Sequence, residues 1–229
     1  MQPRDRGAVG KNAGRVLERA GLQDVLETHP RLRIVPTQDA DAVCVKGVLA
    51  FDADLAGVGS IRDEYRIVLK VPFRFPLTLP TVREVGGRIS SDYHTNPDGT
   101  LCLGSPVRLH LALADDPTLL GFIDRCVVPF LAGYTYLERT GREWTPGLAH
   151  GDAGLIDDYM SLLHVRDKKG CVEMMDLMGM KKRVANKLPC PCGSLLRVGR
   201  CHHRVLNDLR LRLGRRWWRS ESVRWARKV

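Results

Sequence analysis

The stretch RDEYRIVLKVPFRFPLTLPTVREV, residues 62–85, decides the fold that the sequence predicts. In its first part Tyr65, Ile67 and Leu69 alternate with mainly polar side chains, which is the pattern of a half-buried strand. Three prolines follow, and because proline cannot donate a ladder hydrogen bond, that part must bend away or run along a sheet edge. Residues 81–85 then form another short strand.

The segments on either side of this stretch complete an α+β pattern. Two further strands are expected before it, over residues 31–37 and 41–51, and a helix is expected over 12–27. After it, residues 86–108 are rich in turn dipeptides and are expected to form a loop. Helices are expected over residues 117–139, 152–164 and 171–185. Successive strands with short connections favour an antiparallel meander, and helices segregated from such a sheet give an α+β fold.

Composition and charge set limits on function. The chain has 229 residues, of which 44% are hydrophobic and 27% charged, so it is globular rather than disordered. The net charge of +10 suggests an anionic partner. However, residues 181–229 hold 15 Lys and Arg against two acids, whereas residues 1–180 have a net charge of −3. The excess positive charge of the C-terminal segment therefore bears on how the protein docks, and it gives little information about the reaction that the protein performs.

The N-terminal sequence and the cysteines bear on localisation. Residues 1–14 are polar and lack the apolar core of a signal peptide, and no apolar run approaches the ~18 residues that span a bilayer. The seven cysteines are odd in number and unevenly spaced, which does not fit a secreted disulfide framework. We expect a cytoplasmic protein without a transmembrane segment, in which cysteines serve metal binding, catalysis or packing.

The strongest chemical signal lies in the loop YHTNPDGTLCLGSP, residues 93–106. Cys102 is a candidate nucleophile, since a cysteine thiolate forms a thioester that stays reactive toward amines and thiols. The neighbouring glycines leave it accessible. No general base is evident beside it, but exchange between thiols of similar pKa needs none. Asn96 is a candidate oxyanion donor.

This loop resembles the active site of ubiquitin-conjugating enzymes. The residues that carry the resemblance are the Pro-Phe-Arg-Phe-Pro run at 72–76, the Gly-Thr-Leu-Cys-Leu run at 99–103, and His94-Thr95-Asn96, where the family has His-Pro-Asn. The interval from Asn96 to Cys102 is shorter than in the eukaryotic enzymes. The resemblance spans residues 31–164 and implies a ubiquitin-conjugating-like fold, with Cys102 as the thioester-forming nucleophile, Asn96 as an oxyanion donor and His94 as a structural hydrogen-bonding residue.

Residues 143–155 are similar to a stretch in bacterial members of this superfamily, which occur in anti-phage operons including short type II CBASS systems. The resemblance implies a transferase in antiviral defence whose cargo is the C-terminus of a cGAS-like nucleotidyltransferase. Because the chain has no Gly-rich nucleotide-binding loop, an activating partner would have to act in trans.

A cluster of potential metal ligands lies near the C-terminus. The sequence Cys190-Pro-Cys192-Gly-Ser is followed, after eight further residues beyond Cys192, by Cys201-His202-His203. Thiolates and imidazoles at this spacing suit tetrahedral zinc. The segment resembles the SEC-C type of zinc motif, which implies Cys190, Cys192, Cys201 and His202 as ligands of a structural zinc ion, with His203 as a weaker candidate.

The sequence divides into a ubiquitin-conjugating-like catalytic domain at 1–164, a helical linker at 165–187, a zinc knot at 188–204 and a basic tail at 205–229. The tail interleaves arginines with three tryptophans, which suits docking on an acidic protein, contact with nucleic acid, or adsorption to a membrane surface. Two alternatives to the transferase therefore stay open: a catalytically inactive adaptor, and a nucleic-acid-binding protein that acts through this tail.

Overall fold

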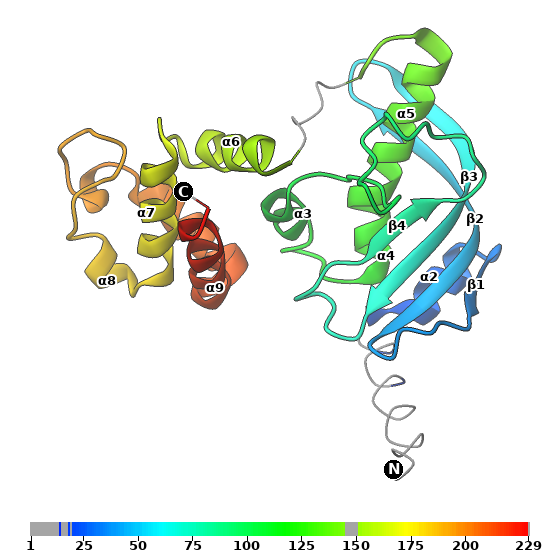
Figure 1. Ribbon diagram of the computed structural model, residues 1–229, viewed down its shortest axis with the longest axis horizontal. Coiled ribbons are helices and arrows are strands. Elements are labelled where there is room, and N and C mark those ends of the chain that lie inside the picture. Colours follow the sequence, from blue (N-terminus) through cyan, green and yellow to red (C-terminus); the bar gives the residue numbers. More distant parts are fainter. Residues whose placement is uncertain (1–13, 15–17, 19, 145–150, 229) are drawn as a thin grey trace. The chain divides into compact units, whose positions relative to one another are not determined.

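The computed structural model describes residues 14, 18, 20–144 and 151–228, and these form two compact units. The first unit consists of the described residues up to 104 together with 116–144 (Figure 1). The second consists of residues 105–115 and 151–228. The boundary expected at residue 164 follows the helix over 151–163, and in the structure this helix packs with the helices that come after it.

The first unit is built on a four-stranded antiparallel sheet in the order β1-β2-β3-β4. The strands are β1 (Leu32–Val35), β2 (Ala42–Leu55), β3 (Gly59–Pro72) and β4 (Thr81–Glu84). This confirms the expected α+β fold with its antiparallel meander. Leu49 lies opposite Tyr65 and Val45 opposite Leu69, and all four are buried, so one face of the sheet carries the core.

The hairpin of β2 and β3 extends beyond the strands that the sequence predicts. Its added residues include Asp52, which sits opposite Arg62 and accepts hydrogen bonds from Arg62 Nε (2.5 Å) and Ser60 Oγ (2.6 Å). Charged residues have low strand propensity, but a cross-strand pair of opposite charge stabilises the ladder. The backbone pairing continues to Leu55 and Gly59, and the exposed Asp52–Arg62 pair adds a small stabilisation to this extension.

Helices cover the buried face of this sheet (Figure 1). They are α2 (Leu22–Thr28), α4 (Leu119–Phe122), a π-helical turn (Ile123–Val127) and α5 (Val128–Thr140), and α5 packs on β2 and β3. The last three together confirm the long helix expected over 117–139. Pro129 lacks the amide that an unbroken α-helix would use, and the π turn lies just before it. The N-terminal helix is described from Leu22, and most of residues 12–19 lie outside the described residues.

A polar network joins α5 to the sheet. Arg88 donates to Asp63 at 2.8 and 2.6 Å and to Glu138 at 2.5 Å, and its guanidinium lies 4.3 Å from the centre of the Tyr65 ring. Thr135 donates to Asp63 at 2.9 Å and shares a 2.8 Å hydrogen bond with the Tyr65 hydroxyl. These hydrogen bonds offset the cost of partly burying the charged groups of Arg88 and Asp63 where α5 packs on β3.

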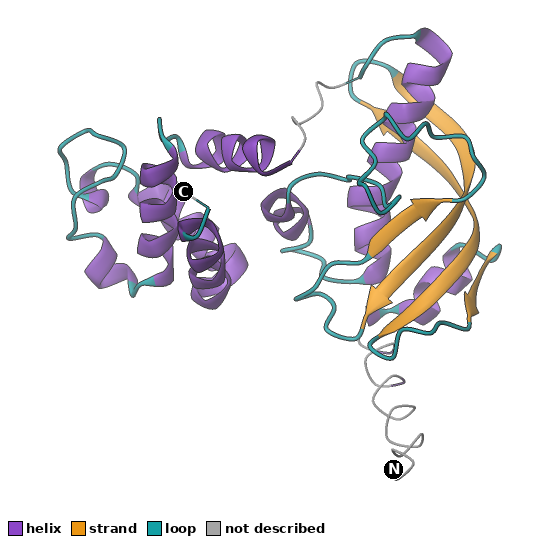
Figure 2. Cartoon of the chain, in the orientation of Figure 1, coloured by secondary structure: helices purple, strands orange, loops and turns teal. Residues whose placement is uncertain are grey.

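The described part of the second unit is helical, as Figure 2 shows. Its elements are α3 (Pro106–Ala112), α6 (Gly151–Leu163), α7 (Lys168–Gly179), α8 (Lys182–Ala185), the 3-10 turn η2 (Val198–Arg200) and α9 (His203–Ala226). The helix expected over 171–185 is thus two helices, because the chain becomes extended at Met180. The expected loop at 86–108 was wrong at its end, since Ser105 caps α3 and Pro106 begins it.

Helix α9 forms the basic tail, and much of it is built into the core of this unit. Gly214 breaks its regularity with φ 78° and ψ 155°. Trp218 and Trp225 are buried, and the Trp218 indole donates to the Leu209 carbonyl at 3.0 Å. Arg210 donates to the carbonyls of Leu177 and Met178 at the end of α7. Part of the basic tail therefore serves packing and helix capping.

None of the helices in the described residues is both long and apolar enough to cross a membrane.

Candidate functional site

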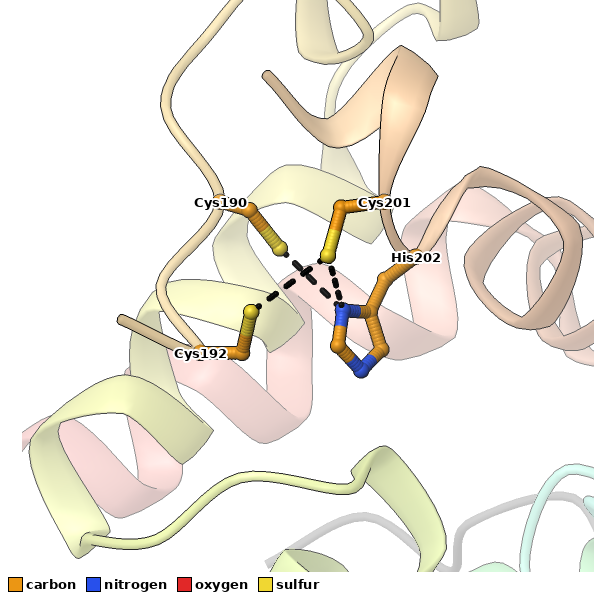
Figure 3. A group of neighbouring side chains, drawn as sticks. All are labelled: Cys190, Cys192, Cys201 and His202. Atoms are coloured by element: carbon orange, nitrogen blue, oxygen red, sulfur yellow. Dashed lines mark hydrogen bonds between the residues drawn. The ribbon is translucent and has the colours of Figure 1, made fainter. Parts of the chain in front are cut away.

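The structure brings the four expected metal ligands together (Figure 3). Cys190, Cys192, Cys201 and His202 offer ligand atoms that all lie within 4.8 Å of one another. The Nδ1 atom of His202 lies 3.2 Å from Cys190 Sγ and 3.1 Å from Cys201 Sγ, and Cys192 Sγ lies 3.5 Å from Cys201 Sγ. The expected Cys3His cluster is therefore present, and it could hold a metal ion.

Two pieces of backbone position these side chains. Residues 189 and 197 form a β-bridge, and the Cys190 amide donates to the Leu196 carbonyl at 2.8 Å, which closes a hairpin around the first two cysteines. Gly193 turns the chain with φ 81°, a conformation that favours glycine. Cys201 follows η2, and His202 is the N-cap of α9.

The donor set and its spacing fit zinc. Two thiolates about 2.3 Å from a tetrahedral zinc ion are separated by about 3.8 Å, and a thiolate and an imidazole nitrogen by slightly less. The ligand atoms here lie 3.1–3.5 Å apart in three pairs and within 4.8 Å in all pairs. Burial and the neighbouring thiols raise the pKa of the Cys190 thiol, and a cation bound in the cluster would favour its ionised form. Burial, together with the nearby His164, lowers the pKa of His202 and favours the neutral imidazole that binds metal.

His203, the weaker candidate, lies outside the cluster. It is the first residue of α9, and its Nδ1 is buried without a hydrogen-bond partner among the described residues. Of the two histidines, His202 is the one that the structure places with the three cysteines.

The candidate thiol loop is held to the sheet by the residue before Cys102. Leu101 is buried, and its amide donates to the Val82 carbonyl of β4 at 2.7 Å. Residues 95 and 101 form an antiparallel bridge, which closes a narrow turn. Gly99 adopts φ 79° within it. Cys102 emerges from this anchor half-buried, as a free thiol.

The structure joins the three candidate catalytic residues only in part. The Cys102 amide donates to the His94 carbonyl at 2.6 Å, so these two residues meet through the backbone. The Asn96 side-chain amide instead donates to Thr100 Oγ1 at 3.0 Å, and Thr100 in turn donates to Asp98 at 2.6 Å. No hydrogen bond of the Cys102 thiol is found within the described part of the chain.

Thr100 is the loop residue that the sequence reasoning missed. It is buried, and it binds both Asn96 and Asp98. The signal was available, because an Asp-Gly-Thr run is typical of a turn in which the Asp carboxylate accepts from the residue two positions on. Asn96 is thus, in this state, part of the turn.

The buried cysteines outside the cluster are unsuited to nucleophilic roles. Burial raises the pKa of Cys126 to about 11 and that of Cys171 to about 12. They pack in the cores of the first and second units respectively.

No known family model matches the chain, and no curated protein is significantly similar to it.

Proposed function

We propose that this protein is a cysteine transferase of the ubiquitin-conjugating type, which carries a protein C-terminus as a thioester on Cys102. The observation that carries the proposal is the anchoring of the thiol loop. Leu101 ties the loop to β4, and the next residue presents a half-buried thiol at the edge of a four-stranded antiparallel sheet. The loop motif at 99–103 and the proline run at 72–76, which resemble that family, lend further support.

The reaction proceeds in two exchanges. In the first, the Cys102 thiolate attacks the carbonyl carbon of an incoming thioester, the new C–S bond forms, the old C–S bond breaks, and the donor leaves as a thiolate. In the second, a neutral acceptor amine attacks the same carbonyl, an amide forms as the C–S bond to Cys102 breaks, and the proton that the amine loses ends on the released Cys102 sulfur. Neither exchange needs a strong base to deprotonate the Cys102 thiol. This agrees with the lack of a side-chain partner for Cys102 within the described residues.

Asn96 would serve as an oxyanion donor after its amide leaves Thr100. One such donor is worth about 2.7–4 kcal/mol in related settings. The short Asn96–Thr100–Asp98 chain holds the side chain in a defined position on the same turn as Cys102. His94 contributes through its backbone carbonyl.

The donor and the cargo are assigned by resemblance. The chain lacks a nucleotide-binding loop, so an activating enzyme supplies the thioester in trans. The cargo is the C-terminus of a cGAS-like nucleotidyltransferase, and the outcome is regulation of CBASS anti-phage signalling in the bacterial cytoplasm. The run at 143–155 supports this assignment, although residues 145–150 within it lie outside the described residues.

Zinc fits this scheme as a structural ion held by Cys190, Cys192, Cys201 and His202. A bound zinc ion would cross-link the hairpin at 189–197 to the start of α9. Four protein ligands leave no open position, so the thiol chemistry at Cys102 does not depend on it.

The test is a reducible adduct. The full chain is co-expressed with the neighbouring operon genes, and we expect a higher-mass species that is lost on thiol treatment. Cys102→Ala should abolish this species, and Cys102→Ser should convert it to a thiol-resistant oxyester. Cys44→Ala, which removes a thiol from a sheet strand, is the matched control and should leave the adduct unchanged.

An inactive adaptor is the second candidate, and one observation favours it. Asn96 is committed to Thr100 rather than to the neighbourhood of the thiol. An adaptor would bind the same operon proteins without forming any reducible adduct. Co-purification that persists in Cys102→Ala, with no thiol-sensitive species from the unaltered chain, would establish the adaptor and refute the transferase.

A further inference from the structure

The second unit has a groove between α3, the end of α6 and the first half of α9, with a volume of about 630 Å³. We name it the α3–α9 groove. All of its lining residues belong to this unit: Arg108, Leu111, Ala112, Leu162, His164, Arg204, Val205, Asp208, Leu209 and Arg212. None of its lining residues is a proposed metal ligand or a proposed catalytic residue, although the His164 ring lies against that of His202, with centroids 6.4 Å apart.

Three arginines, a histidine and one acid, Asp208, are among the residues that line this groove. Arg108 pairs with the buried Asp158 through Nε and Nη2. Arg212 donates through Nη2 to the Leu111 carbonyl at 2.9 Å and pairs with the exposed Asp115 at 3.4 Å. Arg204 is exposed and makes no ion pair or hydrogen bond with the residues that the structure describes. A guanidinium has five N–H donors, so these contacts leave donor capacity for an anionic ligand.

The interior of the groove is aliphatic. Leu111 and Leu209 are buried, while Leu162 and Val205 are half-buried and present apolar surface. The lining contains no Trp, Tyr or Phe. A surface that binds bases needs aromatic platforms for stacking, so these walls favour aliphatic side chains over nucleobases.

The charged and the apolar residues of α9 that line the groove form two parallel rows along the helix. Arg204, Asp208 and Arg212 recur at every fourth residue, and Val205 and Leu209 form a parallel row beside them. Rows with this spacing lie along one helical face. They match an amphipathic segment that carries acids along one edge and aliphatic anchors along the other.

We propose that the α3–α9 groove binds an acidic peptide segment with aliphatic anchors, contributed by a partner protein. Residues 105–115 and 148–229 hold 19 Lys and Arg against nine Asp and Glu, a net charge of +10, whereas the rest of the chain is neutral overall. The second unit thus carries the whole net positive charge, which steers an acidic partner toward it. The proposal does not require the thioester chemistry, and its test does not involve Cys102.

The experiment uses the full chain and fluorescein-labelled helical peptides, with binding followed by fluorescence anisotropy. The probe has Leu at every third or fourth position and Glu on the remaining positions. Comparison peptides replace every Glu with Lys, or every Leu with Ser, and a single-stranded DNA of equal charge is the fourth probe. We expect the Glu/Leu peptide to bind most tightly, with loss of affinity when either feature is removed.

The decisive variant is Arg204→Glu, with Arg216→Glu as its matched control. Arg216 is an exposed arginine of the same helix that does not line the groove. Arg204→Glu should weaken binding of the Glu/Leu peptide about fivefold to tenfold and improve binding of the Lys/Leu peptide. Arg216→Glu should change both affinities less than twofold. Thermal melting of each variant verifies the fold, and Arg204→Gln replaces Arg204→Glu if that variant melts early.

Three outcomes would overturn the proposal. One is the absence of Glu/Leu peptide binding at low salt. Another is equal weakening by Arg204→Glu and Arg216→Glu, which would reveal attraction to the overall charge of the unit. The third is tighter binding of the DNA with the same dependence on Arg204, which would make the groove a nucleic-acid site.

Discussion

The backbone amide of Cys102 lies 2.6 Å from the carbonyl oxygen of His94 and donates a hydrogen bond to it. The two residues therefore depend on each other through the main chain. His94 has φ 38°, in the left-handed region that Asn and His tolerate and β-branched residues avoid. The backbone of His94 thus holds the Cys102 amide, while its imidazole packs edge-on against the Tyr93 ring, with centroids 4.9 Å apart.

Substitution of His94 tests this dependence. His94→Asn should keep adduct formation within a few-fold, because Asn accepts the left-handed conformation. His94→Val should strain the turn by about 1–2 kcal/mol and lower the rate of adduct formation. The readout is the rate at which the reducible species appears. Equal rates in both variants, well below that of the unaltered chain, would assign the role to the imidazole instead.

Asp63 makes the first unit sensitive to acid. Its hydrogen bonds from Arg88 lower the pKa of the carboxyl group to about 2, below the ordinary value of 3.8. Because the pKa is depressed in the folded state, the stabilisation is present above about pH 4 and is lost as the pH falls toward 2. Asp63→Asn should therefore cost about 2 kcal/mol at pH 7 and flatten the stability profile over that acid range.

Hydrogen exchange of the β2 and β3 amides measures this effect within the first unit. Asp54→Asn is the control, since Asp54 is exposed on the same hairpin and has no ion pair within the described residues. A pH profile for Asp63→Asn that coincides with the profile of the unaltered chain would mean that the Arg88 network adds nothing to stability.

The sheet was predictable because its signals are local. Alternation over Tyr65, Ile67 and Leu69 sets the face of β3, and short connections set the meander. The start of α3 carried an equally local signal, Ser105 followed by Pro106, but Ser-Pro is ambiguous between a turn and a capped helix. The residues downstream do not resolve that ambiguity, because Val107, Leu109 and Leu111 alternate with Arg108 and His110 in the period of a strand.

The metal ligands were predictable for the same reason, whereas the groove was not. Cys190 and Cys192 share one turn, and Cys201 and His202 are adjacent, so spacing alone brings four ligands close. Arg108 and Arg204 are 96 residues apart and meet only through packing of α3 beside α9. Likewise, no sequence pattern indicates that Asn96 donates to Thr100 instead of pointing toward the thiol.

Removal of metal should affect the second unit selectively. We expect one zinc ion per chain by elemental analysis, and its loss in His202→Ala together with loss of helical signal. His203→Ala should retain the metal, because His203 lies outside the cluster. Cys102→Ser should also retain the metal, because it removes a thiol that is not part of the cluster. Loss of metal from His203→Ala and retention by His202→Ala would reassign the fourth ligand.

Trp218 tests whether the basic tail is a structural element or a free docking arm. The side chain is fully buried, and its indole donates to the Leu209 carbonyl across the break at Gly214. Trp218→Ala should therefore destabilise the second unit by about 3–5 kcal/mol, through lost burial and the cavity left behind. Leu211→Ala, at a position that is 84% exposed in the same helix, should change stability by less than about 0.5 kcal/mol.

Urea denaturation followed by tryptophan fluorescence and by far-ultraviolet circular dichroism measures the stability of both variants. A Trp218→Ala variant as stable as Leu211→Ala would mean that the tail does not pack on α7 in solution, and the arginines of α9 would then be available to partners along the whole helix.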